Sequence, residues 1–122
     1  MIYGIGCDMT EIERLEKAIK SEHFYQRVFS KEEQNELSLK NIPSQSVAAC
    51  FAAKEAFSKA IGTGVRGFAL NEVSLLHTEN GKPYLSLSGQ AKELVDNLQI
   101  KMFHVSVSHT SALAMCVVIA EQ

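Results

Sequence analysis

Three charged residues, Lys54, Glu55 and Lys59, lie in a segment that is otherwise almost entirely apolar, FAAKEAFSKAIGTG at residues 51–64. If the segment is helical, Glu55 and Lys59 are four residues apart and share one stripe of the helix. The stripe is otherwise formed by small residues, namely Ala48, Ala52 and Gly62. Because a helix that is apolar on nearly every side is usually buried, we expect the Glu55 carboxylate to be paired or to bind a metal.

Asp8 is a second carboxylate with small neighbours. Residues 1–9 alternate as a strand does, which puts Gly4, Gly6 and Asp8 on one face. Glycines on that face leave room beside it. Asp8 is therefore expected at the end of a strand, with space for another group to approach.

Asp8 and Glu55 together have the chemistry of a site for a hard divalent cation. Magnesium typically takes one or two protein carboxylates and completes its shell with water and phosphate oxygens. Lys59 would add positive charge, and the turn Gly62-Thr63-Gly64 would add amide donors for a phosphate group. These residues predict a magnesium and phosphate site.

Structural interpretations of the same residues are equally well supported by the pattern alone. Asp8 would then cap the first helix, and Glu55 with Lys59 would form a solvated pair contributing only about 0.3–0.5 kcal/mol. His104 and His109 would be hydrogen-bonded residues at strand ends. A glycine after a helix is most often a cap.

The remaining pattern predicts an alternation of strands and helices. A capping box at Thr10 and Glu13 predicts a helix over about 11–20, and a second one at Ser30 and Glu33 predicts a helix ending near Leu39. We further predict a helical segment over 23–29, a loop over 40–45, a helix over 46–61, strands over 68–79 and 82–87 joined by Asn80-Gly81, a helix over 88–98, and strands over 101–109 and 112–120. Strands grouped in hairpins indicate an α+β fold, an antiparallel sheet packed against helices.

Length and composition fit one ordinary globular domain. The chain has 122 residues, of which 46% are hydrophobic and 21% charged, and its net charge of −2 argues against a nucleic-acid partner. The three cysteines, Cys7, Cys50 and Cys116, are far apart, so neither a disulfide framework nor a zinc site is expected. No targeting segment is visible and the longest apolar run is too short to span a bilayer, so we expect a cytoplasmic protein without a membrane partner.

Three motifs, in this order, closely resemble those of the holo-acyl-carrier-protein synthases: GIGCDMTEIERL, FAAKEAFSKAIGTG and HVSVSHT, with GKPYL between the last two. The similarity covers essentially the whole chain and implies a single 4′-phosphopantetheinyl transferase domain over residues 1–122. It implies a magnesium-dependent transfer of 4′-phosphopantetheine from coenzyme A to a serine of apo acyl carrier protein, releasing adenosine 3′,5′-bisphosphate and serving fatty acid biosynthesis. It also implies a homotrimer with active sites between subunits.

The resemblance also implies a role for individual residues. Asp8 and Glu55 would be the magnesium ligands, with Lys59 near the coenzyme A diphosphate, where it stabilises or protonates the departing phosphate. The nucleotide would lie near Gly62, Thr63 and Gly64, and its phosphates near His109 and Thr110. Four basic residues would face the acidic carrier protein: Arg14, Lys17, Lys20 and Arg27. We hypothesise that Glu55 helps to remove the serine proton, directly or through a bound water.

Two features depart from the family pattern. Family members commonly have an arginine where this chain has Cys50, so one phosphate contact is expected to be absent, with Arg66 or Lys40 as candidates to replace it. The first helices are also less basic than in some relatives, which predicts weaker and more salt-sensitive docking of the carrier protein.

Two other classes of function remain open at this point. The first is a non-catalytic binding module that keeps the nucleotide site, and the presence of Asp8, Glu55 and Lys59 together argues against it. The second is another magnesium-dependent phosphoester enzyme such as a small hydrolase. The chain has no clear nucleophile motif of serine, cysteine or histidine, which argues against this alternative.

Overall fold

The computed structural model describes residues 1–122 and is organised around one long helix, α4 (Ser44–Ile61). Its 18 residues make a helix about 27 Å long at 1.5 Å per residue. The helix ends at Gly62, whose φ of 83° is left-handed, so the predicted glycine cap is confirmed. The start lies two residues earlier than predicted, directly after Pro43.

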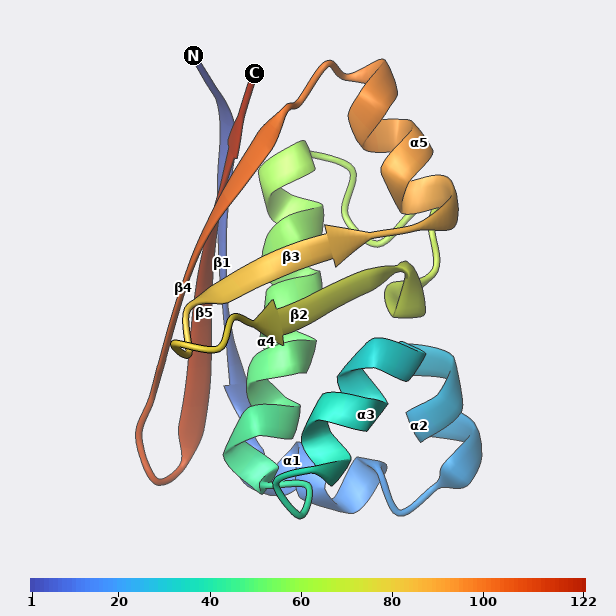
Figure 1. Ribbon diagram of the computed structural model, residues 1–122, viewed down its shortest axis with the longest axis vertical. Coiled ribbons are helices and arrows are strands. Elements are labelled where there is room, and N and C mark those ends of the chain that lie inside the picture. Colours follow the sequence, from blue (N-terminus) through green and yellow to red (C-terminus); the bar gives the residue numbers. More distant parts are fainter.

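A three-stranded antiparallel sheet lies along one side of α4 (Figure 1). Its strands are β1 (Ile2–Glu11), β5 (Leu113–Glu121) and β4 (Met102–His109), with β5 in the centre and the other two at the edges. The register pairs Asp8 with Cys116 and Cys116 with Val107. The inward face carries the buried Gly6, Thr10, Cys116 and Val118, and α4 packs on this face.

A second, two-stranded sheet crosses the other side of α4 in Figure 1. It consists of β2 (Val73–His77) and β3 (Pro83–Leu87), joined by the predicted hairpin around Asn80-Gly81. The first of these strands is shorter than predicted, because residues 70–72 form the 3-10 turn η1 (Leu70–Glu72). Helix α5 (Gly89–Asn97) follows β3. The predicted α+β class is confirmed, and the strands form two antiparallel sheets rather than one.

Three short helices cover one end of α4: α1 (Ile12–Ala18), α2 (Glu22–Val28) and α3 (Lys31–Ser38) (Figure 1). The capping box at Ser30 is confirmed, with the Glu33 amide donating to Ser30 Oγ over 3.1 Å and the Ser30 amide donating to Glu33 Oε1 over 3.0 Å. No helix of this structure has the length and apolar character needed to cross a membrane.

The capping box predicted at Thr10 is wrong. Pairing of β1 with β5 continues as far as Glu11 opposite Leu113, so Thr10 stays in the extended strand. Its hydroxyl donates to Asp8 Oδ2 over 3.1 Å instead of capping a helix. Helix α1 therefore begins only at Ile12, behind an N-cap, Glu11, that makes no side-chain cap.

Candidate active site

The two glycines of β1 bring this strand into direct contact with the backbone of α4. A Cβ atom added at Gly6 would lie 2.0 Å from the Ala56 carbonyl oxygen, and one added at Gly4 would lie 2.1 Å from that of Ala60. Side chains at positions 4 and 6 would thus push the helix away. The space predicted beside these glycines is occupied by the backbone of α4.

This contact sets the position of Asp8, the next inward residue of β1. Two residues of a strand advance about 6.6 Å and four residues of a helix about 6 Å, so the series Gly4–Ala60 and Gly6–Ala56 continues with Asp8 at the level of Ala52. Ala52 shares its helical stripe with Glu55 and Lys59. The fold therefore brings Asp8 to the helix face that carries the predicted site residues.

Lys59 contacts Asp8 directly. Its Nζ lies 3.5 Å from Asp8 Oδ1 and donates to the Cys7 carbonyl over 2.9 Å. The Asp8 side chain is 20% exposed and that of Lys59 is 53% exposed, so both groups are open to a ligand from solvent. Glu55 is half-buried and takes part in no ion pair.

Both structural interpretations of these carboxylates are wrong. The N-cap of α1 is Glu11 and not Asp8. Lys59 pairs with Asp8 and not with Glu55, so the solvated pair within the helix does not form. The charge of Asp8 is also felt across the sheet, because burial first and then the Asp8 carboxylate raise the pKa of the Cys116 thiol to about 12.

The donor set suits a magnesium ion better than a closed transition-metal site. Asp8 and Glu55 supply hard carboxylate oxygens, and the partial exposure of Asp8 leaves space for water and phosphate oxygens. Nowhere in the chain do three or more side chains of His, Cys, Asp or Glu gather into a closed set of metal ligands. A cation held here would take most of its ligands from water and from a bound phosphate.

The turn predicted to contact the nucleotide lies at the C-terminal end of α4. The amides of Gly62 and Gly64 donate to the carbonyls of Lys59 and Ser58, over 3.1 and 3.2 Å. These two amides are therefore used by the helix end, and the Thr63 amide is the donor that remains.

His109 is the last residue of β4 and Thr110 follows it, at the start of the turn to β5. Figure 1 shows this turn toward the opposite end of α4 from the 62–64 turn. His109 lines a hollow of about 200 Å³ together with Ala49 and Cys50 of α4. Ala49 and Gly62 are 13 residues apart, which is about 20 Å along the helix. Within one chain, the 62–64 turn and His109 therefore cannot hold the same phosphate group.

Cys50 also lines that hollow and is only 4% exposed. Burial first, and then the Glu33 carboxylate, raise the pKa of its thiol well above the ordinary value. Of the two residues considered as replacements for the family's arginine, Lys40 lines the hollow and Arg66 does not. His104, in contrast, is paired with Glu121 over 2.8 Å, as its structural interpretation predicted.

The basic residues predicted to face a carrier protein are all exposed on or beside α1 and α2: Arg14, Lys17, Lys20 and Arg27. Lys17 pairs with Glu13 over 3.1 Å. Arg14 lies over the ring of Phe51, with its guanidinium carbon 5.7 Å from the ring centre. The contact of Arg14 with Phe51 connects the exposed face of α1 to the helix that carries Glu55.

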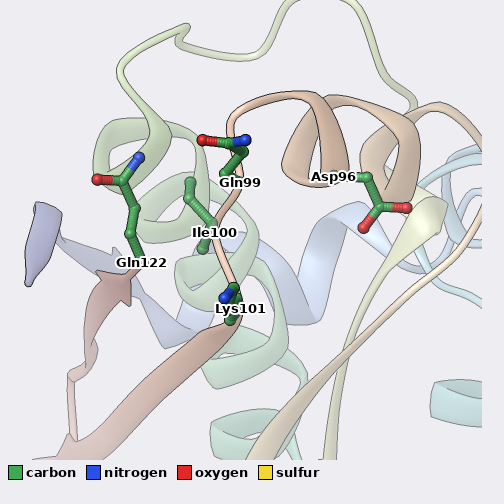
Figure 2. A pocket seen from close by; sticks show the side chains of 5 residues that line it. All are labelled: Asp96, Gln99, Ile100, Lys101 and Gln122. Atoms are coloured by element: carbon green, nitrogen blue, oxygen red, sulfur yellow. The ribbon is translucent and has the colours of Figure 1, made fainter.

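Two features were not found from the sequence. One is a fully buried ion pair between Lys54 and Glu33, for which the only signal was a third charge in an apolar helix. The other is an open hollow of about 460 Å³ at the turn between α5 and β4. Figure 2 shows its lining residues, Asp96, Gln99, Ile100, Lys101 and Gln122, none of which belongs to the predicted site.

Comparison with known families assigns the chain to a class of proteins. The model of the 4′-phosphopantetheinyl transferase superfamily matches residues 4–116, so the chain belongs to this superfamily of transferases. Within it, the chain is similar to proteins named holo-[acyl-carrier-protein] synthase. It is 42% identical over 125 residues to that of Vibrio cholerae, covering 100% of this chain and 99% of the relative, and 42% identical over 117 residues to that of Caldanaerobacter subterraneus, covering 95% and 92%.

Solved structures agree with this assignment. The holo-[acyl-carrier-protein] synthase of Neisseria meningitidis superposes with a TM-score of 0.92 at 32% identity, covering 100% of both chains. The Helicobacter pylori enzyme, solved in complex with coenzyme A, superposes with a TM-score of 0.82 at 32% identity, covering 96% of this chain and 99% of the other. The resemblance drawn from the three sequence motifs is confirmed.

Proposed function

We propose that this chain is a cytoplasmic holo-[acyl-carrier-protein] synthase, converting apo to holo carrier protein for fatty acid biosynthesis. It would transfer 4′-phosphopantetheine from coenzyme A to a serine hydroxyl of apo acyl carrier protein, with magnesium, and release adenosine 3′,5′-bisphosphate. The observation that carries the proposal is the contact of Lys59 with Asp8 on the stripe of α4 that also bears Glu55. Two hard carboxylates and an ammonium group in one open place match the charges of a diphosphate donor and its cation.

In this mechanism Asp8 and Glu55 would hold the magnesium ion. When bound, the ion neutralises charge on the diphosphate and helps to align the reacting groups. Lys59 is half-exposed and reaches Asp8, so its ammonium is free to move to the departing phosphate and to stabilise or protonate it. Glu55 has no ion-pair partner of its own and is our candidate for removing the serine proton.

The nucleotide-binding part of the site would come from a neighbouring subunit. In one chain, β1 with Asp8 and β4 with His109 are the two edges of the sheet, with β5 between them, which separates them by about 10 Å. The outer face of this sheet is uncovered and apolar, with Ile5 65% exposed and Met9 61% exposed. A closed homotrimer that buries this face would bring the β1 edge of one chain to the β4 edge of the next.

The acidic carrier protein would dock on the exposed basic face of α1 and α2. Arg14, Lys20 and Arg27 have no ion-pair partner within the chain, whereas Lys17 is already paired with Glu13. Long-range attraction to this face would steer association, and salt would weaken it.

Intact-mass spectrometry tests the reaction directly. Apo acyl carrier protein is incubated with this protein and coenzyme A, once with magnesium and once with a chelator. The expected result is a mass gain of one phosphopantetheine group that depends on magnesium. Coenzyme A binding without any mass gain on several carrier proteins would overturn the transferase proposal and favour a non-catalytic binding module.

A further inference from the structure

The buried ion pair of Lys54 and Glu33 joins three elements at one point. Lys54 Nζ lies 2.5 Å from Glu33 Oε1 and 2.5 Å from the Val73 carbonyl oxygen, so α4 is tied to α3 and to β2. Glu33 also accepts from the amides of Ser30 and Leu75, over 3.0 and 2.9 Å. Both charged side chains are 0% exposed, and no buried polar side-chain atom of the protein lacks a hydrogen-bond partner.

Stability alone explains this network poorly. A buried ion pair loses its hydration on folding, and well-packed apolar residues of similar volume are often at least as stabilising. An ion pair with several fixed hydrogen bonds differs from apolar packing in having essentially one geometry. The pair therefore restricts the rotation of α4 about its own axis, because Lys54 reaches its partners in only one rotational setting of the helix.

The opposite side of α4 restricts this rotation less well. There the helix meets β1 through glycines and alanines, at the close approaches of Gly4 to Ala60 and Gly6 to Ala56. Contacts between such small residues are close but have few side chains to interlock. These close approaches fix the distance of the helix from β1, and the hydrogen bonds at Lys54 fix its rotation about its own axis.

Lys54 and Glu55 are adjacent in the helix. Fixing the direction in which Lys54 leaves the helix therefore also fixes the direction of Glu55, 100° further around the axis. Glu55 and Lys59 lie on the stripe that faces Asp8. A misplacement of reacting groups by about 1 Å is enough to cost roughly 100-fold in rate. We propose that the Lys54–Glu33 pair is a positioning device that sets the rotation of α4 and thereby holds Glu55 and Lys59 opposite Asp8; its catalytic consequence rests on the proposed function above.

The test compares Glu33→Gln and Lys54→Met with a matched control, Val95→Ala, which truncates a buried residue of α5 outside the network. Turnover is measured with coenzyme A and carrier protein well below the melting temperature of each variant. We expect kcat to fall at least about 10-fold in the two network variants with KM for coenzyme A within about threefold of wild type, while Val95→Ala keeps its kcat. If the network variants retain the kcat of the control per folded molecule, the pair serves stability only and the proposal is overturned.

A crystal structure of Glu33→Gln separates this proposal from the proposed function. The substitution keeps the size of the side chain and an acceptor for the Ser30 amide, but it leaves the buried Lys54 ammonium without a carboxylate. Where it does not fold, the structure of Lys54→Met serves instead, because Glu33 then keeps the amides of Ser30 and Leu75 as donors. A changed separation of Glu55 from Asp8 relative to wild type supports positioning, and an unchanged one overturns it. This readout holds even if the wild-type protein transfers nothing, an outcome that would overturn the proposed function alone.

Discussion

At the scale of single residues, we expect Asp8 to be needed for the reaction but to contribute little to the stability of the fold. Its side chain contacts the exposed ammonium of Lys59 at 3.5 Å and accepts from the Thr10 hydroxyl, and an ion pair this open contributes about 0–1 kcal/mol. We therefore expect Asp8→Ala to fold with a melting temperature close to that of wild type. Its magnesium-dependent product formation should fall by at least about 100-fold, as when one electrostatic stabiliser is removed from an active site. Circular dichroism and the mass assay measure the two effects, and a variant that does not fold would instead make Asp8 a structural residue.

Glu55 differs from Asp8 because its carboxylate takes part in no ion pair. Glu55→Gln keeps the size of the side chain and removes its negative charge and its capacity to accept a proton. If Glu55 helps to remove the serine proton, kcat should fall more than the affinity for coenzyme A does. Steady-state kinetics with calorimetry of coenzyme A binding measures both. Equal losses in the two quantities would leave Glu55 with a purely ligating role.

At the scale of elements, the contact of β1 with α4 depends on glycine. A Cβ atom at position 6 would lie 2.0 Å from the Ala56 carbonyl oxygen and 2.7 Å from the Ala60 amide nitrogen. These are backbone atoms that move only if the helix moves. Gly6→Ala should therefore destabilise the fold by about 3 kcal/mol or more, the upper range for overpacking. Cys7→Ala, on the outer face of the same strand, is the matched control and should leave thermal unfolding of the chain almost unchanged. Similar melting temperatures for the two variants would contradict this account.

Helix α5 is capped by a residue of another element. The carboxylate of Glu72 accepts from the amides of Ala69 and Gln90, over 2.9 and 3.0 Å, and Ser88 makes no side-chain cap. Desolvation raises the pKa of Glu72, but the backbone hydrogen bonds from Ala69, Gln90 and Ala91 outweigh it, so the pKa is lowered overall. A lowered pKa in the folded state means that the stabilisation is complete above the unfolded value of about 4.3 and is lost as the pH falls through the folded-state pKa.

Glu72→Gln should consequently lower the free energy of unfolding by about 0.5 kcal/mol at pH 7, the low end for a helix cap because solvent screens this carboxylate, and by less at pH 3. The reason is that a neutral amide resembles the protonated carboxyl, so wild type and variant converge once Glu72 is protonated. Urea unfolding at both pH values measures the difference. Glu79→Gln, in the exposed β2–β3 turn, is the control and should show no such pH dependence. A difference that stays constant between pH 7 and pH 3 would rule out the carboxylate as the cap.

Elements governed by local chemistry were predictable from the sequence, and those governed by distant pairing were not. The Ser30 capping box, the Gly62 cap and the Asn80-Gly81 hairpin depend on neighbours within a few residues. The Thr10 capping box failed because strand pairing with residues near 113 outcompeted a local hydrogen bond. The same limit applies to Lys54, whose partner Glu33 is 21 residues away in the chain and had already been assigned to a local cap.

At the scale of the whole molecule, the candidate site is split. The sequence motifs predict its residues as a group, but periodicity cannot tell which of them converge within one chain. Asp8 and Lys59 do converge, whereas His109 lies on the opposite edge of the sheet and the 62–64 turn at the far end of α4. The uncovered apolar face formed by Tyr3, Ile5, Met9 and Met115 gives the chain a surface through which a second copy could supply the remainder.

Complementation between two inactive variants tests this division of the site. Asp8→Ala and His109→Ala remove groups at opposite edges of the sheet and should each be inactive as pure proteins. If each site takes Asp8 from one chain and His109 from the next, mixed assemblies contain some interfaces in which both groups are intact. Random mixing in equal amounts around a closed ring makes about one interface in four complete, so co-expression should restore about a quarter of wild-type activity. Sedimentation of each variant verifies that it assembles. A mixture that assembles and stays inactive would mean that Asp8 and His109 of the same chain serve one site, and a monomeric wild-type protein would exclude a shared site altogether.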